Sequence, residues 1–174
     1  MNAWIKGLVI AVVQVGLVAS LGAKMLYDRA TRPRVWALTA PYDPNLPIRG
    51  RYVSLQLVVE APGIQETKPR GMLVLKAVAL RVEGNRLIAE PIPGRILYDS
   101  SDLYVRFIDR RGEKLAVLNQ PVAFFIPEHI ADPSRRAQGE ELWVEVTVPR
   151  KGPPRPIRLG VKKGDGPIVS LEIH

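Results

Sequence analysis

The fold is decided by residues 43–57, DPNLPIRGRYVSLQL, where a turn braced by two prolines runs directly into an alternating strand. The prolines fix their φ angles and lack backbone donors, so the segment before Arg49 can neither pair continuously in a sheet nor wind into a helix. From Tyr52 onward, polar and apolar residues alternate with the period of two that is typical of a half-buried strand. We expect Tyr52 and Gln56 on the polar side of this strand and Leu55 on the side that meets the core.

The rest of the chain repeats this pattern of short strands and turns. Turn signals recur about every ten residues, and the 16 prolines and 14 glycines argue against a helical bundle. The prediction is therefore an all-β fold, an antiparallel β-sandwich or barrel, with one N-terminal transmembrane helix and at most one short extra helix. That extra helix would begin with Asp132 as its N-cap and Pro133 at its first position, and it would end before Gly139. Pro91 and Pro93 are expected to interrupt a strand.

The amino-terminal segment is apolar. Residues 7–23 carry no charge, and only Gln14 and Ser20 among them are polar. With flanking aromatic residues, the span 4–27 is long enough to cross a bilayer at about 1.5 Å per residue. We expect a membrane anchor and stalk over residues 1–32 and an all-β soluble domain over 33–174. A cleaved signal peptide is the alternative, because the apolar run is short and small residues lie near its end.

The strand after the prolines resembles the motif of the GDYXXLXY family, which comprises membrane-anchored bacterial proteins and is named only for that motif. Gly50, Tyr52 and Leu55 match the motif, and the same proline-braced approach precedes them. Arg51 stands where the motif has Asp, and Leu57 stands where it has its last Tyr. The N-terminal apolar helix and the segment FFIPE, residues 124–128, also resemble features of that family.

The orientation of the anchor is predicted differently by charge and by resemblance. Lys24, Arg29, Arg32 and Arg34 follow the apolar segment, whereas Lys6 alone precedes it. The positive-inside rule would then place the domain in the cytoplasm. The resemblance implies the outer, periplasmic side of a bacterial inner membrane. We expect the outer side, because a first anchor that follows a short amino-terminal tail often acts as a signal-anchor. The domain that follows such an anchor is exported.

Composition narrows the possible partners and chemistries. The net charge of +8 favours anionic surfaces or other membrane proteins as partners, in addition to membrane lipid around residues 4–27. Nucleic-acid binding is not expected, since aromatic residues make up only 6% of the chain. The absence of cysteine excludes disulfides and thiolate chemistry. Basic residues recur in pairs that could gather at one end of the domain, at 110–111, 135–136, 150–151, 155 with 158, and 162–163.

Few residues have a pattern that indicates catalysis or metal binding. The sequence does not indicate which residues would hold His129 or His174 in a catalytic or metal site, and residues 99–102 (DSSD) are more typical of a turn than of a calcium site. Ser54 and Lys76 could form the nucleophile and base of a membrane-anchored hydrolase of Ser/Lys type. No catalytic residue, metal or cofactor is predicted.

The expected function is binding, as an accessory subunit of a membrane assembly, with the Ser/Lys hydrolase as the alternative. The candidate contact residues are Arg49, Arg51 and Tyr52, together with Asp43, whose carboxylate can form an Asx turn with nearby backbone donors. The prolines between them would hold these side chains in place before a partner arrives.

Overall fold

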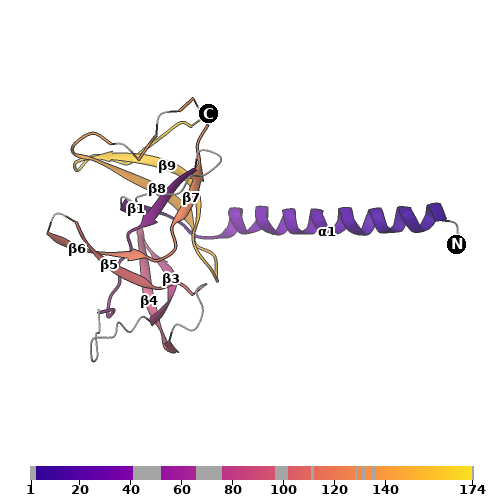
Figure 1. The fold of residues 1–174 in the computed structure, drawn as a ribbon, viewed down its shortest axis with the longest axis horizontal. Helices are drawn as coiled ribbons and strands as arrows, with labels where there is room; N and C mark the ends of the chain where they lie inside the picture. Colours follow the sequence, from indigo (N-terminus) through magenta and orange to yellow (C-terminus); the bar gives the residue numbers. More distant parts are fainter. Residues whose placement is uncertain are drawn as a thin grey trace. The chain divides into compact units, whose positions relative to one another are not determined.

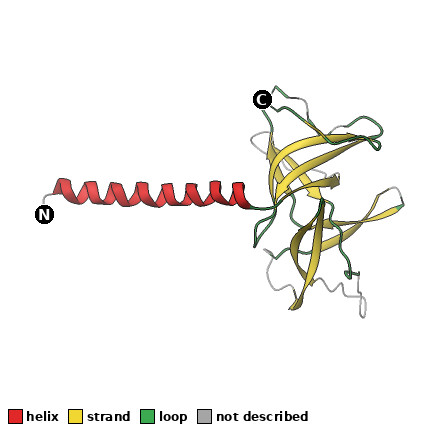
Figure 2. Cartoon of the chain, turned by 180° about the vertical axis from the view of Figure 1, so that it is seen from behind, coloured by secondary structure: helices red, strands yellow, loops and turns green. Residues whose placement is uncertain are grey.

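The computed structural model describes a long helix and ten strands (Figure 1). The described residues are 3–40, 52–65, 76–96, 102–110, 112–127, 129–130, 132–134 and 136–173. They group into two compact units, residues 1–32 and residues 33–174. All the described strands belong to the second unit (Figure 2). The prediction of an all-β fold with one N-terminal helix is confirmed.

The first unit is the helix α1 (Ala3–Thr31). Its side chains from residue 4 to residue 27 are all exposed. It is long and apolar enough to cross a membrane, with a mean hydropathy of 2.0. Near its carboxyl end, the Arg32 guanidinium donates to Oδ1 of Asp28 at 2.9 and 3.1 Å. The helix ends before Pro33, whose ring disfavours the helical conformation of the preceding residue.

The larger part of the β domain is a six-stranded sheet in which every neighbouring pair is antiparallel. In spatial order the strands are β10 (Val169–Ser170), β9 (Arg155–Lys163), β8 (Glu140–Thr147), β1 (Arg34–Ala40), β2 (Tyr52–Leu57) and β7 (Val122–Phe125). Buried and less buried residues alternate along β1, from Val35 inward-facing to Trp36 outward-facing. This alternation has the period of two that is typical of a half-buried strand.

Together with this sheet, two hairpins form a half-barrel. They are formed by β3 (Lys76–Glu83) with β4 (Arg86–Ile96), and by β5 (Val105–Arg110) with β6 (Glu113–Leu118). Single bridges join them to each other and to the chain after β2, including an antiparallel bridge between Val58 and Val117. The core between these sheets is aliphatic, and Leu57, Leu118 and Leu159 are fully buried in it.

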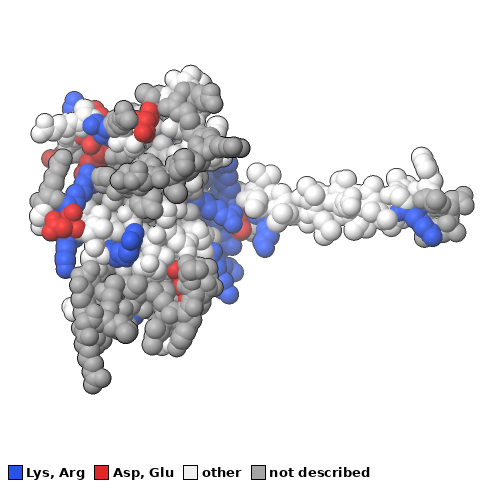
Figure 3. Space-filling model, in the orientation of Figure 1, with Lys and Arg blue, Asp and Glu red and all other residues white. Residues whose placement is uncertain are grey.

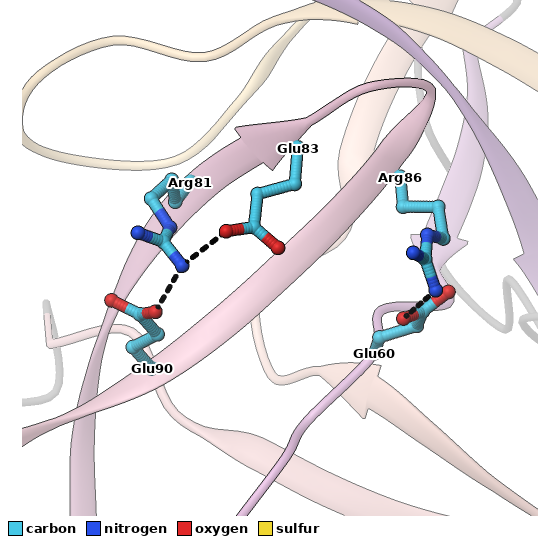
Figure 4. A network of polar contacts seen from close by, with 5 residues as sticks. All are labelled: Glu60, Arg81, Glu83, Arg86 and Glu90. Carbon is cyan, nitrogen blue, oxygen red and sulfur yellow. Dashed lines mark hydrogen bonds and ion pairs between the residues drawn. The ribbon is translucent and has the colours of Figure 1, made fainter.

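Ion pairs lie on the surface of the β3–β4 hairpin (Figure 4). Arg81 lies between the carboxylates of Glu83 and Glu90, and Arg86 reaches Glu60 in the segment after β2 at 3.2 Å. These side chains are about half exposed, so each pair stabilises the fold by roughly 0–1 kcal/mol. The backbone does more to attach the hairpin, because the carbonyl of Glu60 accepts from the amide of Ala89 and its amide donates to the carbonyl of Leu87.

Three local expectations differ from the structure in whole or in part. Gln56 is buried, and its Nε2 donates to the carbonyl oxygen of Leu118 at 3.1 Å. Pro91 and Pro93 lie inside β4 and do not end it, but the pairing with β3 is interrupted after Pro91, where the register shifts from Val78↔Pro91 to Lys76↔Ile96. Residues 132–134 form a turn and not the start of a helix, and the Asp132 carboxylate accepts from both the amide and the hydroxyl of Ser134.

The position of Pro91 has a simple physical reason. It lies opposite Val78, whose amide donates to Leu103 on the other side of β3. Residues directly opposite in an antiparallel pair exchange both of their hydrogen bonds or neither. The nitrogen of Pro91 therefore points away from β3, where no ladder bond is lost.

Candidate binding surfaces

Tyr52 is the one predicted contact residue that the structure describes, and it is half exposed in an aromatic pair. It begins β2 directly opposite Phe125, the last residue of the outermost strand β7. The ring centroids are 5.4 Å apart and the rings meet edge to face at 67°. The exposed fractions are 46% for Tyr52 and 57% for Phe125. Asp43, Arg49 and Arg51 lie outside the described residues.

This pair is the main exposed apolar feature in the described part of the β domain. Among the large hydrophobic residues described there, only Tyr52, Phe125 and Val169 are exposed. Val169 belongs to β10, at the opposite edge of the sheet from β7. Exposed aromatic residues beside each other cost solvation free energy in the isolated domain and are typical of contact surfaces. The sequence motif contained Tyr52, but Phe125 becomes its neighbour only through the pairing of β2 with β7.

The outer face of the sheet carries two tryptophans that the sequence reasoning did not single out. The Arg158 guanidinium lies 5.3 Å from the ring centre of Trp36, and its Nε donates to Oε2 of Glu145 at 2.6 Å. The Lys162 ammonium lies 5.8 Å from the ring centre of Trp143. These two cations already have partners within the domain. They stabilise the outer face and are poor candidates for binding an external anion.

The basic pairs do not gather in one place. Lys162 and Lys163 lie opposite Glu141 and Glu140 at the carboxyl end of β9. At the other end of the same strands, a row across the sheet runs from Arg34 through Thr147 to Arg155. On the face shown in Figure 3, basic side chains are likewise spread over several parts of the β domain. Among the pairs whose two residues are both described, 150–151 lies in the turn between β8 and β9 and 162–163 lies at the opposite end of β9, so these pairs do not share one end of the domain.

The basic end near the start of β1 includes the turn between β8 and β9. Arg150 and Lys151 are exposed in this turn, as are Arg34 and Arg155 in the strands beside it. Among the described residues, no ion pair involves Arg150, Lys151 or Arg155. These three cations therefore differ from those on the outer face, because they lack a described carboxylate partner.

The candidates for catalysis do not assemble into a site. Ser54 is half buried on β2 opposite Ala123, whereas Lys76 is exposed at the start of β3, in a different sheet. His129 is exposed, and residues 99–101 and 174 lie outside the described part of the chain. Within the described residues, no group of His, Cys, Asp and Glu could hold a metal ion.

Two surfaces thus stand out in the described β domain, one aromatic and one basic. The first is formed by Tyr52 and Phe125 at the edge of the sheet, and the second by Arg34, Arg150, Lys151 and Arg155 at one of its ends. The first suits an apolar contact with a protein, and the second suits an anionic surface. Comparisons of the chain with protein-family models, with curated proteins and with solved structures found no match.

Proposed function

We propose that this protein is a membrane-anchored, non-catalytic envelope protein that binds another protein of a membrane assembly and acts as its accessory subunit. The resemblance of residues 43–57 to the GDYXXLXY motif supports this proposal, as does the exposed apolar helix at the amino terminus. Exposure of so long an apolar helix to water costs solvation free energy, whereas a bilayer buries its apolar side chains.

The observation that carries the proposal is the aromatic pair of Tyr52 and Phe125. It joins the motif strand β2 to the outermost strand β7, and both of its rings are about half exposed. Aromatic side chains of this kind dominate the binding free energy of many interfaces, because they bury a large area with few rotatable bonds. The partner would accept these rings in an apolar pocket, with Arg49 and Arg51 close in sequence to add polar contacts.

The proposed location is the inner membrane of a bacterium, with the β domain on the outer side. The apolar helix supports membrane attachment, and the resemblance to envelope proteins supports the side. The charges that follow the helix favour the opposite side under the positive-inside rule.

Site-specific photo-crosslinking in native membranes tests the binding surface. A photoreactive phenylalanine analogue at position 125 is expected to give a discrete adduct with one other membrane or envelope protein. The same group at Val169, which is also exposed but lies at the opposite edge of the sheet, is expected to give none. Tyr52→Ala, combined with the photoreactive group at position 125, should reduce the yield of the adduct, because it removes half of the contact.

Three results would contradict the proposal. One is the absence of any adduct from position 125, and another is the same adducts from positions 125 and 169. The third is recovery of the protein alone from membranes solubilised under mild conditions. Circular dichroism of each variant shows whether its fold is retained, so that loss of the adduct is not mistaken for unfolding.

A further inference from the structure

The start of β1 and the turn between β8 and β9 lie at the same end of the sheet. Arg34 is opposite Thr147, which is in turn opposite Arg155, so one row crosses three strands. Neighbouring strands are about 5 Å apart, so the backbones of Arg34 and Arg155 are separated by roughly 10 Å. The amide of Val148 also donates to the carbonyl oxygen of Pro33 at 3.1 Å.

The turn that follows Val148 presents two more cations. It reads PRKGPP over residues 149–154, in which Gly152 has a φ of 88°. Arg150 and Lys151 are exposed, whereas Pro154 is buried and attaches the turn to the domain. Prolines on both sides restrict the backbone of this turn, so the two cations are held outward with little entropy left to lose.

Chain connectivity brings this end of the sheet close to the end of the helix. Helix α1 ends at Thr31 and β1 begins at Arg34, three residues further on. A chain of that length spans at most about 11 Å, whatever the angle between the two units. If the helix crosses a bilayer, this connection keeps Arg34 within reach of the end of the membrane anchor.

The two ends of the sheet differ in charge balance. At the far end, Lys162 and Lys163 lie opposite Glu141 and Glu140. At the end where β1 begins, no described carboxylate pairs with Arg150, Lys151 or Arg155. An unbalanced positive surface next to a bilayer is attracted to anionic lipids, by about 1 kcal/mol per charge close to the membrane.

We propose that Arg34, Arg150, Lys151 and Arg155 form a headgroup-facing surface that binds the anionic phospholipids around the protein's own anchor. This inference rests on the membrane anchor of the proposed function and adds a second contact to it. The surface would hold the β domain against the bilayer and so restrict the directions in which Tyr52 and Phe125 can meet a partner.

Fluorescence quenching in reconstituted vesicles tests the proposal with the full chain. Because the chain has no cysteine, one introduced cysteine takes one fluorophore. Pro153→Cys places it in the exposed turn at the end of the sheet where β1 begins, and Gln138→Cys places it in the exposed turn before β8 at the opposite end. The vesicles contain a quencher on the headgroup of a tracer lipid, in either phosphatidylcholine alone or phosphatidylcholine mixed with phosphatidylglycerol.

Quenching of the probe at position 153 is expected to rise with phosphatidylglycerol and to fall again in high salt. Arg150→Gln with Lys151→Gln should lower the ratio of apposed to free domain by roughly fivefold per cation. Lys162→Gln with Lys163→Gln removes the same amount of charge but should leave this ratio unchanged, because those lysines lie at the far end opposite glutamates. The probe at position 138 should not respond to lipid charge.

The proposal is overturned if the probe at position 153 does not respond to phosphatidylglycerol, as expected for a surface that binds an acidic protein instead. It is also overturned if both double variants reduce quenching equally, since net charge alone would then explain the effect. Extraction of the vesicles with alkaline carbonate separates this failure from that of the proposed function. A protein that stays with the lipid but shows no response contradicts only the headgroup surface, whereas a protein that is extracted contradicts the anchor.

Discussion

Gln56 places a primary amide inside an aliphatic core. The residue is only 4% exposed, and its Nε2 donates to the carbonyl oxygen of Leu118. This bond joins the motif strand to the end of β6, which is 62 residues further along the chain. A buried amide that loses its partner, or a carbonyl that loses its donor, retains the full cost of its lost hydration.

Replacing Gln56 with Ala should therefore destabilise the β domain by about 2–3 kcal/mol, from the orphaned carbonyl of Leu118 and the space left behind. The free energy of unfolding, measured by chemical denaturation and tryptophan fluorescence of the full chain in detergent, checks this. Gln138→Ala is the matched control, because Gln138 is exposed and should change the free energy by less than about 0.5 kcal/mol. Equal effects of the two substitutions would show that the buried bond contributes nothing.

Glu145 is a second polar residue that the fold buries, and its contribution to stability depends on its neighbours. Its side chain is 10% exposed and is paired with Arg158, which is 53% exposed and also lies over the ring of Trp36. Arg158→Gln would leave this carboxylate nearly buried without a cation. Because solvent reaches the pair from the arginine side, the expected loss in the free energy of unfolding is about 2 kcal/mol, below the value for a fully buried pair.

Arg155→Gln on the same strand is the control for this prediction. Arg155 is exposed, and no described carboxylate pairs with it, so the expected change in the free energy of unfolding is within about 0.5 kcal/mol. Chemical denaturation of both variants measures the difference. A loss for Arg155→Gln as large as for Arg158→Gln would mean that the charge, and not the Glu145 pair, supports the strand.

At the scale of the elements, strand β9 runs close beneath the ring of Trp36. A Cβ atom at Gly160 would lie 2.7 Å from Cγ2 of Ile168 and 2.9 Å from Cζ3 of Trp36. Both approaches are shorter than van der Waals contact allows. Glycine at this position therefore lets the indole of β1 reach across β8 and pack on β9.

Gly160→Ala should destabilise the domain by roughly 1–3 kcal/mol through overpacking. Denaturation of Gly160→Ala, of Trp36→Leu and of the double variant gives the coupling between the two positions. The double variant should lose less than the sum of the two single losses, because Trp36→Leu removes one of the two side chains that an added methyl group would strike. Strictly additive losses would argue that the indole does not approach β9 as closely as described.

The elements also show which features the sequence could predict. The burial alternation of β1 follows the period of two, which depends only on neighbours along the strand. The burial of Gln56 depends on a carbonyl in β6, and the tolerance for Pro91 depends on the hydrogen bond of Val78 with Leu103. Neither partner can be inferred from the local pattern.

The candidate surfaces were less predictable than the strands for the same reason. Tyr52 was identified from its motif, but its partner Phe125 follows from the register of β2 against β7. The basic residues were visible as pairs, yet the row from Arg34 to Arg155 exists only because two antiparallel registers align at Thr147. Sequence pairs such as Lys162 with Lys163 looked equivalent to Arg150 with Lys151, and their opposing glutamates make them different.

At the scale of the whole molecule, the charge pattern and the family resemblance predict different sides of the membrane for the β domain. The cations after the helix favour the cytoplasm under the positive-inside rule, and Arg150, Lys151 and Arg155 do not enter that count because they are remote in sequence. If these residues bind headgroups as proposed, the positive charge near the anchor serves lipid binding after insertion. That role would leave the positive-inside count unchanged, because the count rests on the cations directly after the helix.

Cysteine accessibility measures the orientation directly, because the natural chain has no cysteine and gives no background. Gln138→Cys lies in an exposed turn of the β domain, and we expect a membrane-impermeant maleimide to label it in intact spheroplasts. Asn2→Cys, on the other side of the apolar helix in the sequence, should be labelled only after lysis. The opposite result, with Asn2→Cys labelled in intact spheroplasts and Gln138→Cys protected, would place the β domain in the cytoplasm. In that case the positive-inside rule would hold, and the binding partner of Tyr52 and Phe125 would have to be sought among cytoplasmic proteins.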